Sequence, residues 1–351
     1  MSVLCRHFGT CGGCTLQDMP AADYRAAKRD IVVRALNRAG VEADVAEIAE
    51  VPPRTRRRAV FKIARRGDAV EGGFHALKSH SIVDMQECLV LTPALTALAQ
   101  RLRTVMTPLL GPGQHVEAHA TECDNGIDIA FRASAKLTPA LTAALAKSAS
   151  ALGAIRITWN GALAFESAAP FVRFGKAEVR LPPEAFLQPT REGEALLRDR
   201  VLQAVKAAKN IADLFCGAGT FSLPLAAQAR VQAVEREQGL LDALAAAARA
   251  TSGLKPVSTV RRDLFKLPLT AGELGKFDAV VLDPPRAGAE AQARELAGSK
   301  VPRLAYVSCD AASFARDARL LADGGYRLET IIPVDQFLWS SHIELVGGFA
   351  R

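Results

Sequence analysis

The chain has 351 residues, 49% of them hydrophobic and 23% charged, which is the composition of a globular protein with room for two domains. This composition excludes a disordered or fibrous chain. No run of eighteen apolar residues occurs, and the chain reaches Cys5, Arg6 and His7 before any apolar core could form, so we expect neither a membrane span nor a secretory signal. We therefore expect a cytoplasmic protein.

The net charge of +7 is concentrated in one stretch of the chain. Residues 51–80 hold eight Lys or Arg against two acids, Asp68 and Glu71. This surplus of six positive charges is nearly the whole net charge of the chain. A surface that neutralises phosphates needs such a dense basic patch, whereas a solvated structural face mixes both signs. The stretch therefore favours contact with nucleic acid, with a solvated strand edge as the alternative.

The N-terminal half has the pattern of an α+β domain. Apolar residues at helical spacing predict a helix over residues 18–39 that ends at Gly40, and a second helix from Pro93 to Gly111. A third helix is expected to begin near Pro139. Strands are predicted at residues 44–51, 58–64, 80–83, 126–132, 154–159 and 163–166, with a glycine turn at Gly72-Gly73.

The C-terminal half, from about residue 184, alternates helices with strands. This rhythm predicts an α/β domain, a doubly wound parallel sheet with crossover helices. Between residues 168 and 184 the pattern changes, so we expect two domains, residues 1–175 and 176–351. The expected strands are 211–215, 231–235, 257–260, 279–283, 304–308, 327–334 and 344–349.

A cofactor site is predicted at the carboxyl ends of the first strands of this sheet. The turn Cys216–Thr220 carries glycines where the backbone must approach a ligand, although it lacks the full six-residue dinucleotide fingerprint. Glu235 ends the next strand, where an acid can accept hydrogen bonds from two ribose hydroxyls. Asp263 follows the third strand and could accept from an adenine amino group in the same way. This order favours S-adenosylmethionine over a nicotinamide cofactor or a purely structural turn.

The residues that react with the substrate are predicted after the next two strands, 279–283 and 304–308. Asp283–Arg286 holds two prolines that fix a loop beside a planar ring, and Cys309 follows the next strand. A cysteine in an apolar stretch is usually a packing residue, but here its neighbours favour a nucleophile. Its thiolate would add to carbon 6 of uracil and make carbon 5 nucleophilic. Glu344, an acid in an apolar strand, is the candidate base, with a paired structural acid as the alternative.

Seven cysteines are present, and three of them, Cys5, Cys11 and Cys14, fall within the first fourteen residues. In a reducing compartment, thiols crowded in this way favour metal binding or catalysis over disulfides.

These motifs together resemble those of the RNA 5-methyluridine (uracil-C5) methyltransferases, from Cys5 to the last strand. The family motifs occur in the family's order as Phe186–Thr190, Gly217–Gly219, Asp283–Arg286, Ser308–Ala311 and His342–Glu344. Two departures are Thr190 in place of Asn, and Asp310-Ala311 in place of Asn-Pro. The resemblance implies a class I methyltransferase domain in which Cys309 is the nucleophile, Glu344 the base, and the methyl donor is bound by Gln188, Phe215, Thr220, Glu235, Asp263 and Asp283.

The resemblance also implies a role for the N-terminal cysteines. Cys5, Cys11 and Cys14 with the distant Cys88 match the pattern that holds a [4Fe-4S] cluster in many family members, while four thiolates suit Zn²⁺ equally well on chemical grounds. The N-terminal α+β domain would then carry an iron-sulfur loop. The chain is similar to shorter members without an N-terminal RNA-binding barrel, so the basic strand at residues 56–66 becomes the main candidate for RNA contact.

We therefore predict a monomeric enzyme that makes 5-methyluridine in structured RNA, with ribosomal RNA favoured over transfer RNA. Two other hypotheses remain open. The chain could be an iron-sulfur RNA-binding protein without turnover, which the Asp310-Ala311 departure motivates, or it could methylate a substrate other than RNA.

Overall fold

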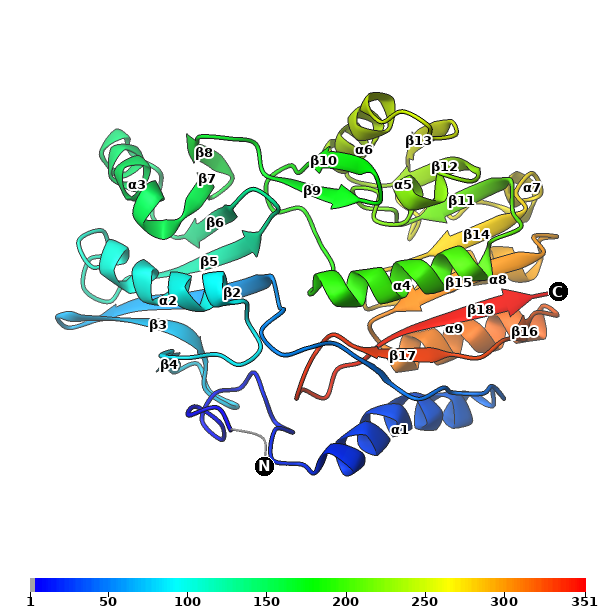
Figure 1. Cartoon of the computed structure of the whole chain (residues 1–351), viewed down its shortest axis with the longest axis horizontal. Helices are drawn as coiled ribbons and strands as arrows, with labels where there is room; N and C mark the ends of the chain where they lie inside the picture. The colour runs from blue at the N-terminus through cyan, green and yellow to red at the C-terminus, as the bar shows by residue number, and fades with distance from the viewer. Residues whose placement is uncertain (1–3) are drawn as a thin grey trace.

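The computed structural model describes residues 4–351, which form two large sheets flanked by helices and a separate two-stranded sheet (Figure 1). The larger sheet has nine strands in the order β1-β17-β18-β15-β14-β11-β12-β13, with β16 paired to β18. Its strands are β1 (Ala49–Glu50), β11 (Asn210–Leu214), β12 (Arg230–Glu235), β13 (Val257–Arg261), β14 (Ala279–Leu282), β15 (Arg303–Ser308), β16 (Arg327–Leu328), β17 (Ile332–Asp335) and β18 (Glu344–Ala350).

The larger sheet is parallel from β13 to β15, and β18 runs antiparallel to β15 and β17. Alternate residues of its strands enter two separate cores: Val280 and Leu282 pack on one face, and Ala279 and Val281 on the other. Helices therefore cover both faces, and the prediction of a doubly wound α/β domain is confirmed. The helices are α4 (Arg191–Ala204), α5 (Ser222–Leu225), α6 (Gln238–Ala250), α7 (Ala271–Leu274), α8 (Glu290–Ala297) and α9 (Ala311–Asp323).

The N-terminal helix α1 (Ala21–Ala39) packs against α9, and β1 adds a parallel strand beside β17. Val32 and Leu36 of this helix belong to the same hydrophobic core as the central strands of the larger sheet. Residues 21–50, which precede the expected boundary at residue 175, therefore lie on the C-terminal sheet. Figure 1 shows α1 along one side of this sheet.

The smaller sheet has the strand order β4-β3-β2-β5-β6-β7-β8, and α2 and α3 pack on it. Both helices begin at a Thr-Pro pair, in which the hydroxyl of Thr92 or Thr138 accepts a hydrogen bond from the first turn. The elements are β2 (Arg58–Arg66), β3 (Ala69–His75), β4 (Ile82–Asp84), α2 (Pro93–Met106), β5 (His115–Glu122), β6 (Ile127–Ala133), α3 (Pro139–Leu152), β7 (Ala154–Trp159) and β8 (Ala162–Glu166).

The predicted glycine turn at Gly72-Gly73 is wrong, because both residues lie inside β3. A Cβ atom at Gly73 would lie 2.2 Å from the carbonyl oxygen of Val83, so the glycine is needed where β4 approaches β3. The turn between β2 and β3 is instead at Gly67, whose φ is 59°.

A short hairpin, β9 (Phe171–Phe174) and β10 (Ala177–Arg180), links the two sheets and packs on α6. Within residues 4–351, no helix is both long enough and apolar enough to cross a membrane.

Candidate active site

The predicted reacting residues meet at one edge of the larger sheet. Asp283 follows β14 and Cys309 follows β15, so both lie at carboxyl ends of parallel strands. Glu344 opens β18, which is antiparallel to β15 with Leu345 opposite Ser308, and this register brings Glu344 to the same edge. The structure therefore brings together three residues that are up to 61 positions apart in the sequence.

The three groups influence one another electrostatically. Burial raises the pKa of the Cys309 thiol to about 11, and the charges of Glu344 and Asp283 add to this effect. Burial also raises the pKa of Glu344 to about 7, and it raises that of Asp283 well above its ordinary value. In the unliganded site the thiol is therefore protonated at neutral pH, whereas Glu344 is close to its titration midpoint.

Two glutamine amides connect the two carboxyl groups. Gln188 Nε2 donates to Asp283 Oδ2 at 3.1 Å, and Gln188 Oε1 accepts from Gln336 Nε2 at 2.8 Å. Gln336 Nε2 also donates to Glu344 Oε2 at 2.9 Å. Sequence reasoning predicted Gln188 and missed Gln336, whose only signal was a polar residue after an apolar strand.

The glycine turn after β11 has the strained backbone expected beside a ligand. Phe215 and Gly217 adopt left-handed conformations with φ of 60° and 55°, and this is costly for a phenylalanine. A Cβ atom at Gly219 would lie 2.9 Å from the side chain of Leu244, so only glycine fits there. Thr220 follows directly, partly buried.

The two predicted acids of the cofactor pocket lie at the next strand ends. Glu235 ends β12, and its carboxylate accepts from the backbone N–H groups of Gly217 at 3.2 Å and Glu237 at 3.1 Å. Asp263 follows β13 and accepts from the N–H of Phe265 at 3.1 Å. The exposed ring of Phe265 lies 5.3 Å from that of Phe215, and sequence reasoning missed this aromatic pair.

Asp213 is a second acid that sequence reasoning missed. It lies inside β11, fully buried, where the hydroxyl of Ser222 donates to it at 2.5 Å. Burial raises its pKa to about 7, and the charge of Glu235 acts in the same direction. An acid within the apolar run of β11 was its only sequence signal.

The two departures from the family motifs are helix caps. Thr190 precedes α4, and its hydroxyl accepts from the N–H of Gly193 at 2.9 Å. Asp310 precedes α9, where its carboxylate accepts from the N–H groups of Ala312 at 3.1 Å and Ser313 at 2.9 Å. Asp310 also pairs with Arg286 at 3.2 Å.

The four predicted cluster cysteines line one cavity of about 430 Å³, between the N-terminal segment and the loop before β18. Burial, together with the neighbouring thiols of Cys88, Cys11 and Cys5, raises the pKa of the Cys14 thiol to about 12. Within residues 4–351, no group of three or more His, Cys, Asp or Glu lies close enough together to hold a single ion.

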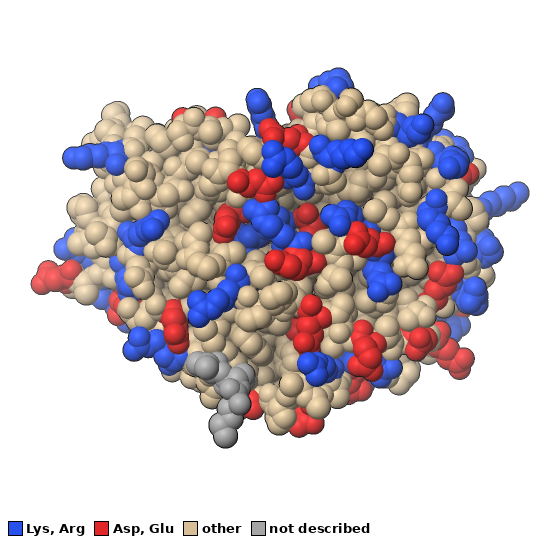
Figure 2. Space-filling view, viewed as in Figure 1, with Lys and Arg blue, Asp and Glu red and all other residues tan. Residues whose placement is uncertain are grey.

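The basic strand β2 is not the free cationic patch that its composition suggested. Arg57 is 2% exposed and pairs with Glu194 at 2.5 Å. Arg58 donates to the carbonyl of Leu187 at 2.6 Å. Partners also hold Lys62, Arg65 and Arg66, namely Glu117, the carbonyls of Thr107 and Leu110, and Glu71. On the face shown in Figure 2, basic and acidic side chains are interspersed.

Phe186, an exposed aromatic residue, begins the Phe186–Thr190 motif that also contains Gln188. Phe186 is 59% exposed, and the guanidinium of Arg58 lies 4.5 Å from its ring centre. Such an exposed ring with a cation on one face offers a stacking surface for a planar group.

A smaller cavity of about 330 Å³ opens beside Cys309. Arg34 and Arg38 of α1 and Arg286 of the Pro-Pro loop line it, together with Asp310. The nucleophile candidate therefore faces a hollow in which cations outnumber acids.

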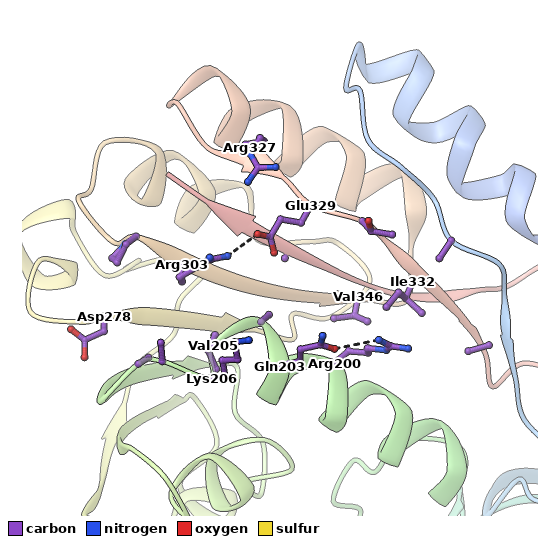
Figure 3. Close-up of a pocket in the computed structure, with 18 of the residues that line it drawn as sticks. Arg200, Gln203, Val205, Lys206, Asp278, Arg303, Arg327, Glu329, Ile332 and Val346 are labelled. Carbon is purple, nitrogen blue, oxygen red and sulfur yellow. Dashed lines mark hydrogen bonds and ion pairs between the residues drawn. The ribbon is translucent and has the colours of Figure 1, made fainter.

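A larger hollow, of about 1240 Å³, lies at the opposite end of the sheet (Figure 3). Its lining includes Asp278 and Arg303 at the amino ends of β14 and β15, and Arg303 pairs with Glu329 at 2.7 Å. Ligands of parallel α/β sheets bind at the carboxyl ends of the strands, and none of the predicted site residues lines this hollow. We therefore place the site at the Cys309 end.

Comparisons with known proteins identify the family of the chain. A model of the family described as tRNA (Uracil-5-)-methyltransferase matches residues 175–349. The chain is 44% identical to a Brucella suis protein described as an uncharacterized RNA methyltransferase, over 99% of this chain and 84% of that protein. It is 31% identical to the 23S rRNA (uracil(1939)-C(5))-methyltransferase RlmD of Shewanella halifaxensis, over 99% of this chain and 82% of that protein.

Among solved structures, the fold is similar to that of Pyrococcus abyssi tRNA (uracil-54, C5)-methyltransferase in complex with S-adenosyl-L-homocysteine. The TM-score is 0.74 at 22% identity, and the match covers 97% of this chain and 85% of that chain. This likeness extends over both sheets and shows the fold.

Proposed function

The chain belongs to the RNA uracil-C5 methyltransferase family, and on this premise we propose that it transfers a methyl group from S-adenosylmethionine to carbon 5 of a uracil in RNA. The observation that carries the proposal is the meeting of Cys309, Asp283 and Glu344 at the sheet edge that also holds the glycine turn. A thiol between two buried carboxyl groups suits covalent addition followed by proton removal.

We propose that Cys309 and Glu344 carry the reaction. With the sulfonium bound, the Cys309 thiol loses its proton to water, the thiolate forms a bond to carbon 6, and the electrons of the 5,6 double bond move toward the carbon 4 carbonyl. Carbon 5 then takes the methyl group, whose bond to the sulfonium sulfur breaks. The carboxylate of Glu344 removes the proton from carbon 5, the double bond returns, and the thiolate leaves. A pKa of about 7 suits Glu344 to this role near neutral pH.

We propose that the methyl donor binds along the carboxyl ends of β11, β12 and β13. When bound, it supplies an electrophilic methyl group on a positively charged sulfur. Glu235 and Asp263 would hold its ribose and adenine ends, and the aromatic pair of Phe215 and Phe265 would pack against the adenine. Thr220, Gln188 and Asp283 would complete the site nearer the reacting carbon.

We propose ribosomal RNA as the substrate, because the relative from Shewanella halifaxensis is named for 23S rRNA. The uridine would be turned out of its helix toward Cys309, and its flanking phosphates would lie against Arg34, Arg38 and Arg286. The exposed ring of Phe186 would stack on a base. We propose these arginines in place of most of β2, because they line the cavity beside Cys309, whereas the cations of β2 do not.

The four thiols of Cys5, Cys11, Cys14 and Cys88 are proposed to hold a [4Fe-4S] cluster. They surround a cavity of about 430 Å³, which has room for a group larger than one ion. Four thiolates around a single Zn²⁺ would lie about 3.8 Å apart, as Zn–S distances of about 2.3 Å require. The proposal rests on the spacing of the four cysteines and on the cavity that they share, and the metal content of the purified protein distinguishes the cluster from zinc.

Protein purified without oxygen tests the cluster. It should be brown and carry iron and sulfide, and Cys88→Ala should lose both while Cys123→Ala keeps them. A colourless protein with stoichiometric zinc would contradict the proposal.

Release of tritium tests the reaction. With RNA labelled at carbon 5 of uracil, the wild type should release tritium only when S-adenosylmethionine is present. Cys309→Ala should abolish the release, and Cys123→Ala should keep it. Absence of release from every ribosomal and transfer RNA, with RNA binding retained, would favour a binding protein without turnover. Mapping of 5-methyluridine in cells with and without the protein then identifies the RNA.

A further inference from the structure

Gln336 lies between β17 and the loop that leads to Glu344, and it is 1% exposed. Its Nε2 atom donates to Gln188 Oε1 at 2.8 Å and to Glu344 Oε2 at 2.9 Å. Both contacts are to oxygen atoms, and Nε2 carries two hydrogens, one for each, while Gln336 Oε1 has no hydrogen-bond partner among the described residues. The Gln336 amide therefore joins the two residues.

The surroundings of Gln336 hold it in this position. A Cβ atom at Gly193 of α4 would lie 2.5 Å from Gln336 Oε1, so the glycine leaves the space that the amide occupies. The preceding residue, Asp335, is fully buried, pairs with Lys28 of α1 at 2.7 Å and accepts from the hydroxyl of Tyr24. Buried contacts on both sides of the chain therefore limit the movement of Gln336.

The titratable groups that face Glu344 are Asp283, after β14, and the Cys309 thiol, after β15. Neither supplies a positive charge. Among the described residues, Gln336 is the one that donates a hydrogen bond to the Glu344 carboxylate. A donor to a buried carboxylate stabilises its ionised form and fixes the direction of its free oxygen.

We infer that Gln336 is a positioning residue for proton removal, which holds the ionised Glu344 carboxylate against carbon 5 and couples it through Gln188 to the Asp283 side of the site. This inference rests on the proposed function. It separates two steps, because methyl transfer needs Cys309 and the donor, whereas release of the covalent product needs Glu344.

The variant Gln336→Met tests the inference, since methionine keeps the volume and loses the hydrogen bonds. RNA with 5-fluorouridine traps the enzyme after methyl transfer, because fluorine at carbon 5 cannot be removed as a proton. We expect trapping by Gln336→Met to stay within about twofold of the wild type, and tritium release to fall about tenfold or more. The covalent adduct with ordinary RNA should accumulate, and the acid limb of the rate profile should move to higher pH.

Two further variants change the hydrogen bond between Gln336 and Glu344. Gln336→Glu places a carboxylate beside Glu344 and should move the acid limb further upward. Gly193→Ala fills the space beside the amide and should reproduce the Gln336→Met ratio of trapping to release without removing the amide.

Two outcomes would overturn the inference alone: equal losses of trapping and release in Gln336→Met, or a wild-type rate and pH profile in that variant. If the wild type forms no covalent adduct with 5-fluorouridine RNA and releases no tritium, both the proposed function and the inference that rests on it are wrong.

Discussion

The surroundings of the Cys309 thiol oppose the ionisation of this thiol. Its pKa is raised to about 11 by burial and by the charges of Glu344 and Asp283. A nucleophile of this kind needs a positive charge beside it before it reacts, and a bound sulfonium supplies one.

Alkylation of Cys309 measures this effect. In the unliganded enzyme the iodoacetamide rate at Cys309 should keep rising above pH 9, and Glu344→Gln should raise that rate at pH 8.5 because one negative charge is lost. The rate is followed by mass spectrometry of the peptide that contains Cys309. A plateau near pH 8.5 in the wild type, as for a free cysteine of pKa about 8.5, would contradict this account.

Glu344 should make the folded protein less stable at high pH. Its pKa rises from an ordinary value of about 4.3 to about 7 on folding, so between these values the folded state binds more protons than the unfolded state. Stability due to the protonated form is therefore present below about pH 4 and lost as the pH rises through 7.

Glu344→Gln should remove this loss of stability at high pH, because glutamine does not ionise. The amide oxygen of the new glutamine can still accept a hydrogen bond from Gln336. Urea unfolding should show the variant more stable than the wild type by up to about 3 kcal/mol at pH 8, with a smaller difference at pH 5. An equal difference at both values would show that the pKa of Glu344 is not raised.

At the scale of elements, the residue beside the nucleophile begins a helix. Asp310 caps α9 through two backbone N–H groups, and this helix packs on both α1 and α8. The cap therefore fixes the direction in which the chain leaves Cys309, which explains why an acid is compatible with the family's motif at this position.

Asp310→Ala should cost about 1 kcal/mol of stability, as the loss of an N-cap does. Asp310→Asn is the matched control, because asparagine also caps a helix, and it should stay within a few tenths of a kcal/mol. Urea unfolding measures both. If the two variants lose stability equally, the effect comes from the ion pair with Arg286 rather than from the cap.

The loop between β17 and β18 connects the two proposed centres. Trp339 accepts through its carbonyl from the N–H groups of Thr15 at 2.7 Å and Leu16 at 3.0 Å, next to Cys14. The buried Lys28 donates to the carbonyl of Phe337 at 3.2 Å. One short loop therefore lines the cysteine cavity and leads into Glu344, so the N-terminal segment contacts the loop that precedes this residue.

For the whole molecule, we propose that the cations nearest Cys309 contact RNA. Arg34, which pairs with Asp30 at 3.1 Å, and Arg38 line the Cys309 cavity, whereas Arg66 lies at the far end of β2 beside Glu71. Charge on the protein adds to RNA affinity when it replaces a counterion of a phosphate.

Arg34→Ala combined with Arg38→Ala should weaken RNA binding and make its salt dependence shallower by about two phosphate contacts. Arg66→Ala, the matched control, should leave both unchanged. Fluorescence anisotropy across a salt series provides the measurement. If Arg66→Ala has the larger effect, β2 is the RNA surface after all.

The amino-acid sequence by itself determined most of the order of helices and strands in the C-terminal sheet, but it did not show that β1 joins this sheet, and it predicted β16 and β17 as one strand over residues 327–334. It also placed the glycine turn, Glu235, Asp263, Asp283 and Cys309 at strand ends. These features depend on local periodicity and on the rule that parallel strands share a carboxyl edge, both of which are readable along the chain.

The tertiary structure alone decided which partners each side chain meets. The antiparallel entry of β18 brought Glu344 to Cys309, and Gln336 became a bridge only when β17 and α4 packed together. The sequence placed Arg57 in a basic patch, whereas in the structure Arg57 is buried and pairs with Glu194, which lies 137 positions away. Such contacts join distant segments, and composition or periodicity within one segment contains no information about them.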